Sequence, residues 1–286
     1  MTFHGEQAIF VGEAAIRVQD LKRSTKFYKE ILGFNVLAET ERSVCFTADG
    51  KKPLLTIEQP DGIKPKEQNT TGLYHFALLL PERAHLAALV KHFADNGVRF
   101  GSSDHLVSEA LYLNDPDGNG IEVYTDRSSS KWSWENGNVL MAVDPLDFEA
   151  LLEDRKGEWN GLPEETVMGH IHLHVSELQK TEEFYVKGLG FDVVSRFGNQ
   201  ALFLSVENYH HHIGLNTWNG VGAPKPQKNT AGLSWFSLVF PTEEKRNEII
   251  SQIKLFGGEV SEDNNGFTTE DPSGNKIKLK IYPENG

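Results

Sequence analysis

The stretches VQDLKRSTKFYKEILGF (residues 18–34) and VSELQKTEEFYVKGLGF (residues 175–191) share one pattern of apolar and polar side chains. In the first stretch, apolar residues recur at helical spacing after Asp20, and the pattern stops at Gly33, the residue type that commonly follows a helix end. A strand-like run, residues 14–18, leads into it. The return of the pattern in the second half indicates an internal repeat, which has to be traced before a fold is assigned.

Two further pairs of segments extend this repeat. PKEQNTTGLYHFALLLP (65–81) matches PKPQKNTAGLSWFSLVFP (224–241), and DPDGNGIEVY (115–124) matches DPSGNKIKLKIY (271–282). Each half also restarts internally, since a strand-like run and a helix from Glu82 to about Asn96 follow the first helix unit. The sequence therefore predicts four modules of β-α-β-β-β order.

The module boundaries give a domain organisation. The modules are expected near residues 9–60, 72–126, 168–219 and 232–282. We expect an N-terminal domain at 1–128 with modules one and two, a linker at 129–167, and a C-terminal domain at 168–286 with modules three and four. The linker is too long for a simple turn and is expected to pack as a lid or spacer.

Composition narrows the classes of partner. The 286 residues include 28 Lys and Arg against 41 Asp and Glu, a formal net charge of −13, which disfavours nucleic acid and anionic membranes. A small molecule is the expected ligand. The single cysteine, Cys45, excludes an internal disulfide, and no N-terminal stretch has a basic start followed by an apolar segment. A cytoplasmic protein without a membrane span is expected, and homo-oligomerisation is left open.

Three adjacent histidines occur in YHHHIGLNTW (209–218). The β-favouring residues that follow them predict a strand. Side chains alternate faces along a strand, so His210 and His212 would share one face and His211 would point to the other. At most two of the three could then serve one site.

Taken together, these segments resemble a known superfamily. Four modules, each with a DL…FY…LGF helix or a DPxGN turn before its last strand, resemble the vicinal oxygen chelate superfamily of glyoxalases, bleomycin resistance proteins and extradiol dioxygenases. Within it, GHIHLHVSEL (169–178), YHHHIGLNTW and SDHLVSEALYLNDPDGNGIEVY (103–124) resemble the catechol 2,3-dioxygenases of bacilli. The resemblance covers nearly the whole chain. It implies an α+β fold in which four βαβββ modules, in two tandem halves, pair into cup-like half-barrels.

The resemblance also implies a metal site built from the first and last strands of the modules. Two histidines and one carboxylate on one side of a metal leave positions open for substrate and O2. The residues at the corresponding positions are Glu13 in module one, His75 and Glu122 in module two, His170 in module three, and Trp235 and Lys278 in module four. Neither half holds a complete set, whereas modules two and three together supply His75, Glu122 and His170. We therefore expect module two to pair with three, and one with four.

Catalytic groups follow from the same resemblance. The family pattern gives His212 the substrate-facing role of acid and base, with His210 on the same face nearer the rim and His211 turned away. It places His105 and Tyr112 ahead of the ligand carboxylate, where they would bind substrate oxygens.

The implied activity is meta-cleavage of a catechol with O2 at a mononuclear Fe(II) site, for which Mn(II) is an alternative metal. Two other functions fit the fold. A glyoxalase-like isomerase or lyase would use a fourth protein ligand, and Gly214 stands near that position. A metal-free drug-binding protein would need none of the three metal ligands.

Overall fold

All four modules fold in the predicted order, with one strand, one helical segment and three further strands. The computed structural model describes residues 3–264 and 266–282. Module one contains β1 (Phe10–Arg17), α1 (Leu21–Glu30), β2 (Asn35–Glu39), β3 (Ser43–Thr47) and β4 (Leu55–Glu58). Module two contains β5 (Gly72–Leu79), α2 (Arg83–Asp95), β6 (Gly101–Asp104), β7 (Ser108–Asn114) and β8 (Gly120–Asp126).

The second half repeats this order. Module three contains β11 (Val167–His174), α4 (Leu178–Glu183), the π-helical turn η2 (Phe184–Gly188), β12 (Asp192–Phe197), β13 (Ala201–Ser205) and β14 (Ile213–Asn216). Module four contains β15 (Gly232–Phe240), α5 (Glu243–Leu255), β16 (Val260–Asp263), β17 (Gly266–Glu270) and β18 (Lys276–Ile281). None of the described helices is long and apolar enough to cross a membrane.

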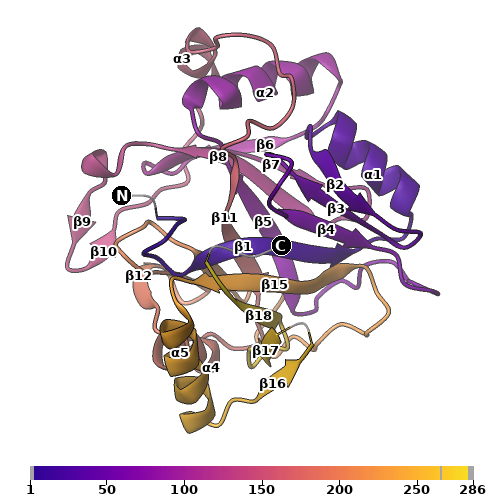
Figure 1. Ribbon diagram of the computed structural model, residues 1–286. Helices are drawn as coiled ribbons and strands as arrows, with labels where there is room; N and C mark the ends of the chain where they lie inside the picture. The colour runs from indigo at the N-terminus through magenta and orange to yellow at the C-terminus, as the bar shows by residue number, and fades with distance from the viewer. Residues whose placement is uncertain (1–2, 265, 283–286) are drawn as a thin grey trace.

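The modules combine into two eight-stranded sheets, and each sheet draws on both halves of the chain. One sheet has the order β16-β17-β18-β15-β1-β4-β3-β2, so it joins modules four and one. The other has the order β12-β13-β14-β11-β5-β8-β7-β6 and joins modules three and two. Figure 1 shows the first junction, where β1 runs beside β15. The predicted pairing of module two with three and of module one with four is confirmed. The division of the chain into domains at 1–128 and 168–286, which follows the repeat in the sequence, stays a prediction.

The two repeated motifs meet in space and tie the sheets together. The hydroxyl of Tyr28, from the FY motif of module one, donates to the carboxylate of Asp115 in the DPDG turn of module two, at 2.9 Å. Tyr185 of module three donates to Asp271 of module four at 3.3 Å. Both aspartates also accept backbone N–H groups of their own turns. The helical segments of modules one and three are thus each held to a turn of the next module.

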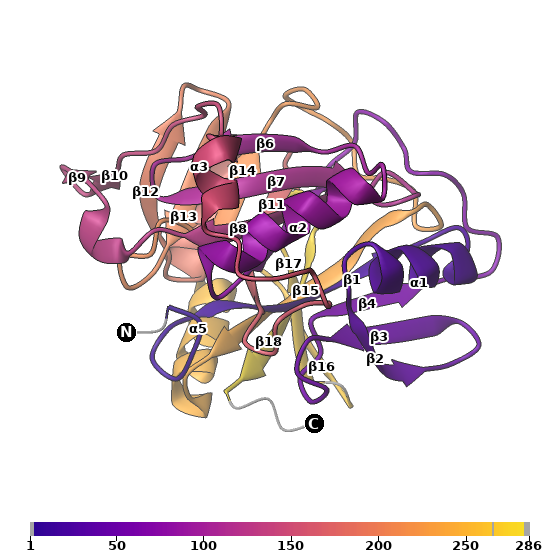
Figure 2. The same cartoon turned by 90° about the horizontal axis from the view of Figure 1, so that it is seen from above.

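The linker at 129–167 is a structured part of the molecule. It contains the elements η1 (Ser129–Lys131), β9 (Trp134–Glu135), β10 (Asn138–Val139) and α3 (Phe148–Glu153). Figure 2 shows α3 beside α2, over the sheet that holds β6 and β7.

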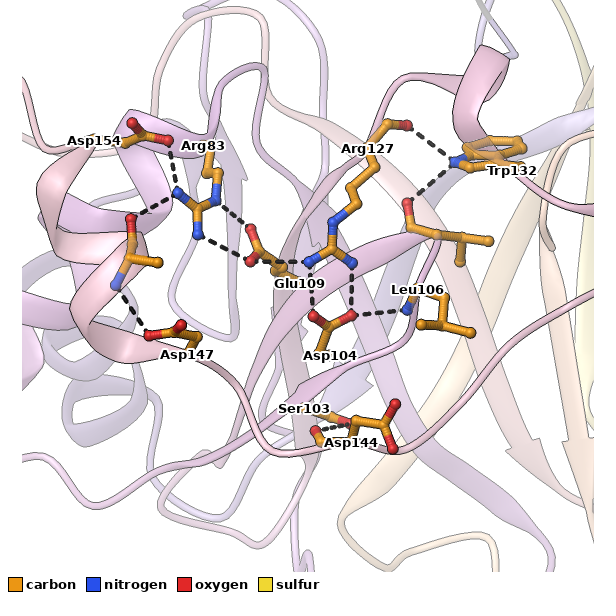
Figure 3. Close-up of polar contacts among 12 residues, drawn as sticks. Arg83, Ser103, Asp104, Leu106, Glu109, Arg127, Trp132, Asp144, Asp147 and Asp154 are labelled. Carbon is orange, nitrogen blue, oxygen red and sulfur yellow. Dashed lines mark hydrogen bonds and ion pairs between the residues drawn. The ribbon is translucent and has the colours of Figure 1, made fainter.

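Ion pairs hold the linker against module two. Arg83 of α2 donates to the carbonyl of Ala150 at 2.9 Å and to Asp154 at 2.6 Å, and its Nε pairs with Glu109 at 2.5 Å (Figure 3). Glu109 also pairs with Arg127 at 3.1 Å, immediately before the linker. Buried Glu109 thus holds Arg83 in place, and Arg83 reaches the linker through the Ala150 carbonyl and through Asp154, whose side chain is 55% exposed.

Candidate active site

The register of three neighbouring strands brings the predicted metal ligands together. Ala77 on β5 lies between Glu122 on β8 and His170 on β11. His75 lies two residues before Ala77 and therefore on the same face of β5. The small Ala77 side chain leaves space over which the three longer side chains converge. The strands that supply these side chains come from modules two and three.

The three ligand atoms lie close to one another. The distances are 3.0 Å from His75 Nε2 to Glu122 Oε2, 3.2 Å from His170 Nε2 to the same oxygen, and 3.3 Å between the two Nε2 atoms. The residues are 6%, 3% and 1% exposed, for His75, Glu122 and His170. A buried carboxylate between two imidazoles is costly unless a positive charge or hydrogen bonds compensate it.

The protonation states of these side chains favour metal binding. Burial alone would raise the pKa of Glu122, but the charges and hydrogen bonds of His170 and His75 outweigh it, so the pKa lies well below its ordinary value. Burial lowers the pKa of His170 to about 4, against the attraction of Glu122. An ionised carboxylate and a neutral imidazole are the forms that bind metals. Two imidazole nitrogens and one carboxylate oxygen fit a divalent transition metal with open positions.

A cavity of about 390 Å³ opens on the side of His75 and Glu122. This volume lies in the range of small-ligand pockets. Its other lining residues include Tyr74, Tyr112, Phe197, Phe203 and Trp218, with Val107, Met141 and Val143. The linker, expected from the sequence to pack as a lid or spacer, thus contributes Met141 and Val143 to the wall.

His105 and Tyr112 lie together in this wall. His105 Nδ1 is 2.6 Å from the carbonyl of Ala142, which can only accept, so Nδ1 carries the proton. His105 Nε2 can therefore accept from the hydroxyl of Tyr112, at 2.5 Å. Burial, reinforced by the charge of Glu122, raises the pKa of Tyr112 well above its ordinary value, which keeps the hydroxyl protonated. The linker residue Ala142 thus sets the orientation of both groups.

The predicted orientation of the three adjacent histidines is wrong. Strand β14 begins only at Ile213, and the histidines precede it in an irregular segment behind Glu207 and Asn208, whose φ angles are 55° and 58°. Strand alternation does not govern such a segment. His211, expected to turn away, lines the cavity, and its ring centroid lies 4.1 Å from that of His170.

The two neighbours of His211 are buried elsewhere. His212, expected to face the substrate, is fully buried, with Nε2 3.0 Å from the carbonyl of Phe3 and Nδ1 3.2 Å from the hydroxyl of Ser205. His210, expected near the rim, is also fully buried, with Nε2 2.8 Å from Asp126 Oδ1. His212 thus secures the N-terminal segment, and His211 occupies the position predicted for His212.

His172 is a cavity residue that the sequence interpretation missed. It lies two residues after His170 on β11 and therefore on the same face, so the alternation in GHIHLHV could have identified it. Its Nε2 accepts a hydrogen bond from the amide of Asn216 at 2.9 Å. A Cβ at Gly214 would lie 2.7 Å from the ring of His172, so the glycine is required for this ring to fit.

The corresponding positions of the other sheet do not form a metal site. Glu13 pairs with Lys280, and the ammonium of Lys278 lies 3.5 Å from the centre of the Trp235 ring. Among the described parts of the chain, His75, Glu122 and His170 are the one cluster of histidines and acidic residues with the spacing of metal ligands. At these positions the second cup therefore has an ion pair and a cation–π contact in place of metal ligands.

Comparison with known proteins agrees with this architecture. A family model described as the glyoxalase/bleomycin resistance protein/dioxygenase superfamily matches residues 11–123 and 167–279. The chain belongs to this superfamily. The predicted resemblance and the fold of four paired modules are thereby confirmed.

Individual relatives add detail. The chain is 44% identical to the catechol-2,3-dioxygenase of Bacillus subtilis over 266 residues, which cover 92% of this chain and 93% of that protein. A solved structure of a proposed dioxygenase from Bacillus subtilis covers 98% of this chain and 87% of its own, with a TM-score of 0.67 and 13% identity. Glyoxalase I of Zea mays covers 95% and 92%, with a TM-score of 0.59 and 16% identity. The two solved structures share the fold.

Proposed function

We propose that this protein is an extradiol dioxygenase that opens the ring of a catechol with O2 at a single metal ion bound by His75, Glu122 and His170. The observation that carries the proposal is the convergence of two imidazoles and one carboxylate beside an aromatic-lined cavity. The 44% identity to a catechol-2,3-dioxygenase over nearly the whole chain supports the same reaction.

The three side chains would hold Fe(II), with Mn(II) as the alternative. When bound, the metal would supply a positive charge that lowers the pKa of a catechol hydroxyl and would offer open positions to the diol and to O2. His75 and Glu122 line the cavity, whereas His170 lies behind it at 1% exposure. This placement leaves the cavity side free for the substrate.

His211 is the group best placed to move a proton. Burial, followed by the repulsion of His170, lowers its pKa well below the ordinary value of histidine, so the ring is neutral. A neutral imidazole at the cavity wall can accept the proton that a catechol hydroxyl loses and return it at a later step. The role predicted for His212 therefore passes to His211.

Tyr112 and His105 would orient the substrate. The Tyr112 hydroxyl donates to His105 Nε2, so its oxygen can still accept a hydrogen bond from a substrate hydroxyl in the cavity. His105 is fixed in turn by the carbonyl of Ala142. A fixed acceptor costs little reorganisation when the substrate binds.

Two observations weigh against the alternatives. No acidic side chain can stand at position 214 as a fourth ligand, because even a Cβ would meet the His172 ring at 2.7 Å. A metal-free drug-binding protein would bury the ionised Glu122 between two imidazoles without a purpose, at a cost in stability. Both observations favour a three-ligand metal enzyme.

The cavity also indicates the kind of catechol. Among the described residues that line it, Arg196 is the only lysine or arginine, and it already pairs with Glu182 at 2.5 Å. Tyr74, Phe197 and Trp218 form an aromatic lining with partly exposed rings. We therefore expect catechols with hydrogen or apolar substituents to be preferred over catechols that carry a carboxylate.

The test is anaerobic reconstitution of the full chain with Fe(II) or Mn(II), followed by measurement of O2 uptake with a panel of catechols. We expect one O2 to be consumed for each catechol, and mass spectrometry to find both oxygen atoms in a ring-opened product. If neither metal supports O2 uptake with any catechol while the metal is stoichiometrically bound, the proposed function is wrong.

A further inference from the structure

Behind the cavity, Asp126, His210 and His211 form a continuous chain of hydrogen bonds. Asp126 Oδ1, at the end of β8, lies 2.8 Å from His210 Nε2. His210 Nδ1 lies 2.8 Å from His211 Nδ1. The chain therefore joins a carboxylate of module two to the cavity-lining imidazole of module three.

The middle of this chain of hydrogen bonds is shielded from solvent. His210 is fully buried, and the rings of Tyr209 and Trp132 lie 4.1 Å and 5.2 Å from it, centroid to centroid. Trp132 comes from the linker and is itself fixed by hydrogen bonds to the carbonyls of Val107 and Arg127. Water therefore has little access to His210, and its ring must find its hydrogen-bond partners among these side chains.

The chemistry of the partners determines where the protons lie. The Asp126 carboxylate can only accept, so His210 Nε2 carries a proton. In a neutral His210 ring, Nδ1 then holds a lone pair and accepts from His211 Nδ1–H. The remaining nitrogen of a neutral His211, Nε2, is left without a proton.

We propose that Asp126 is a positioning residue that sets the tautomer of His211 through His210, so that His211 presents an unprotonated Nε2 to the cavity. This inference rests on the proposed function, because it makes His211 ready to accept a proton from a catechol. The residue that provides this readiness lies two side chains away, with its carboxylate 21% exposed on the far side of the rings. Neither Asp126 nor His210 touches the cavity.

The tautomer can be read directly. In the full chain, loaded with Zn²⁺ as a diamagnetic metal and labelled with ¹⁵N-histidine, protonated and unprotonated ring nitrogens give separate NMR signals. His211→Gln identifies the signals of His211. We expect its Nδ1 to be protonated and its Nε2 to be unprotonated in the unmodified chain, and this pattern to be lost in Asp126→Asn and Asp126→Leu.

Turnover of the iron-loaded enzyme gives the second measurement. Loss of an outer partner of a metal-bound imidazole typically costs about 10- to 100-fold. By analogy, kcat should fall by about this factor in both variants while the metal content is unchanged. Asp126→Glu keeps the carboxylate and should recover most of kcat and the original tautomer. Asp61→Asn, which removes an exposed carboxylate in the turn after β4, controls for the change in net charge.

The outcomes separate the two proposals. An unchanged His211 tautomer in both Asp126→Asn and Asp126→Leu overturns the inference, as does a protonated Nε2 in the unmodified chain. Either result leaves the dioxygenase activity of the unmodified enzyme intact. A chain that shows the expected tautomers but no O2 uptake with any catechol refutes the proposed function instead.

Discussion

Replacing His211 by phenylalanine should lower turnover, whereas replacing His212 by phenylalanine should lower stability. His211 lines the cavity, so His211→Phe removes the proposed proton acceptor. General acid–base catalysis is typically worth about 100- to 10,000-fold, and kcat should fall by a factor in this range. The metal ligands do not depend on His211 for hydrogen bonds, so metal content should persist.

His212→Phe should reduce stability instead. His212 contacts the Phe3 carbonyl at 3.0 Å and the Ser205 hydroxyl at 3.2 Å, and both contacts are lost. A buried polar group left without a partner costs about 1–3 kcal/mol. In a chain of this size Tm should fall by about 2–4 °C for each kcal/mol lost. Turnover per bound metal should stay within a few-fold of the original.

The assay is kcat per mole of bound iron for each variant, beside Tm from calorimetry. Metal content must be measured in every sample, because lost metal would imitate lost proton transfer. Full activity of His211→Phe together with an inactive, fully metal-loaded His212→Phe would refute the assignment. That result would restore the orientation expected from strand alternation.

Three further predictions concern the metal, the repeat and pH. Glu122→Gln keeps the side-chain size but removes the negative charge, so Fe(II) affinity measured by equilibrium dialysis should fall at least about 10-fold. Tm of the metal-free chain should change little. Retained affinity would exclude Glu122 as a ligand. Tyr28→Phe removes the 2.9 Å hydrogen bond to Asp115 and should lower the free energy of unfolding, measured in urea, by about 1–3 kcal/mol without loss of activity. An unchanged free energy of unfolding would contradict the proposed contribution of this contact. Burial lowers the pKa values of His4 and His170 to about 4, so between this pH and about 6.5 the unfolded chain binds protons that the folded chain does not. The free energy of unfolding of the metal-free protein should therefore be highest above about pH 6.5 and should fall as the pH drops toward 4. A stability that rises on acidification would contradict this prediction.

Much of the fold could be predicted from local pattern and repetition. Helix α1 begins after Asp20, which accepts from the backbone N–H of Arg23, and a glycine with a φ of 80° follows at position 33. Such signals act within one turn of the chain, so they are visible in the sequence. The pairing of modules two and three also followed, because each half holds an incomplete set of metal ligands.

The sequence by itself determined the four modules, because these depend on periodic strands and recurrent motifs. The resemblance that these motifs carry then implied the superfamily and the three residues that converge at the candidate metal site. Only the tertiary structure decided which histidine faces the cavity, since the segment before Ile213 has no regular register and its rings follow their partners Phe3 and Asp126. Only the tertiary structure likewise placed the carbonyl of Ala142, in the linker, within hydrogen-bond distance of His105. Contacts between residues far apart in the chain depend on how separately folded segments pack, and no local pattern encodes that packing.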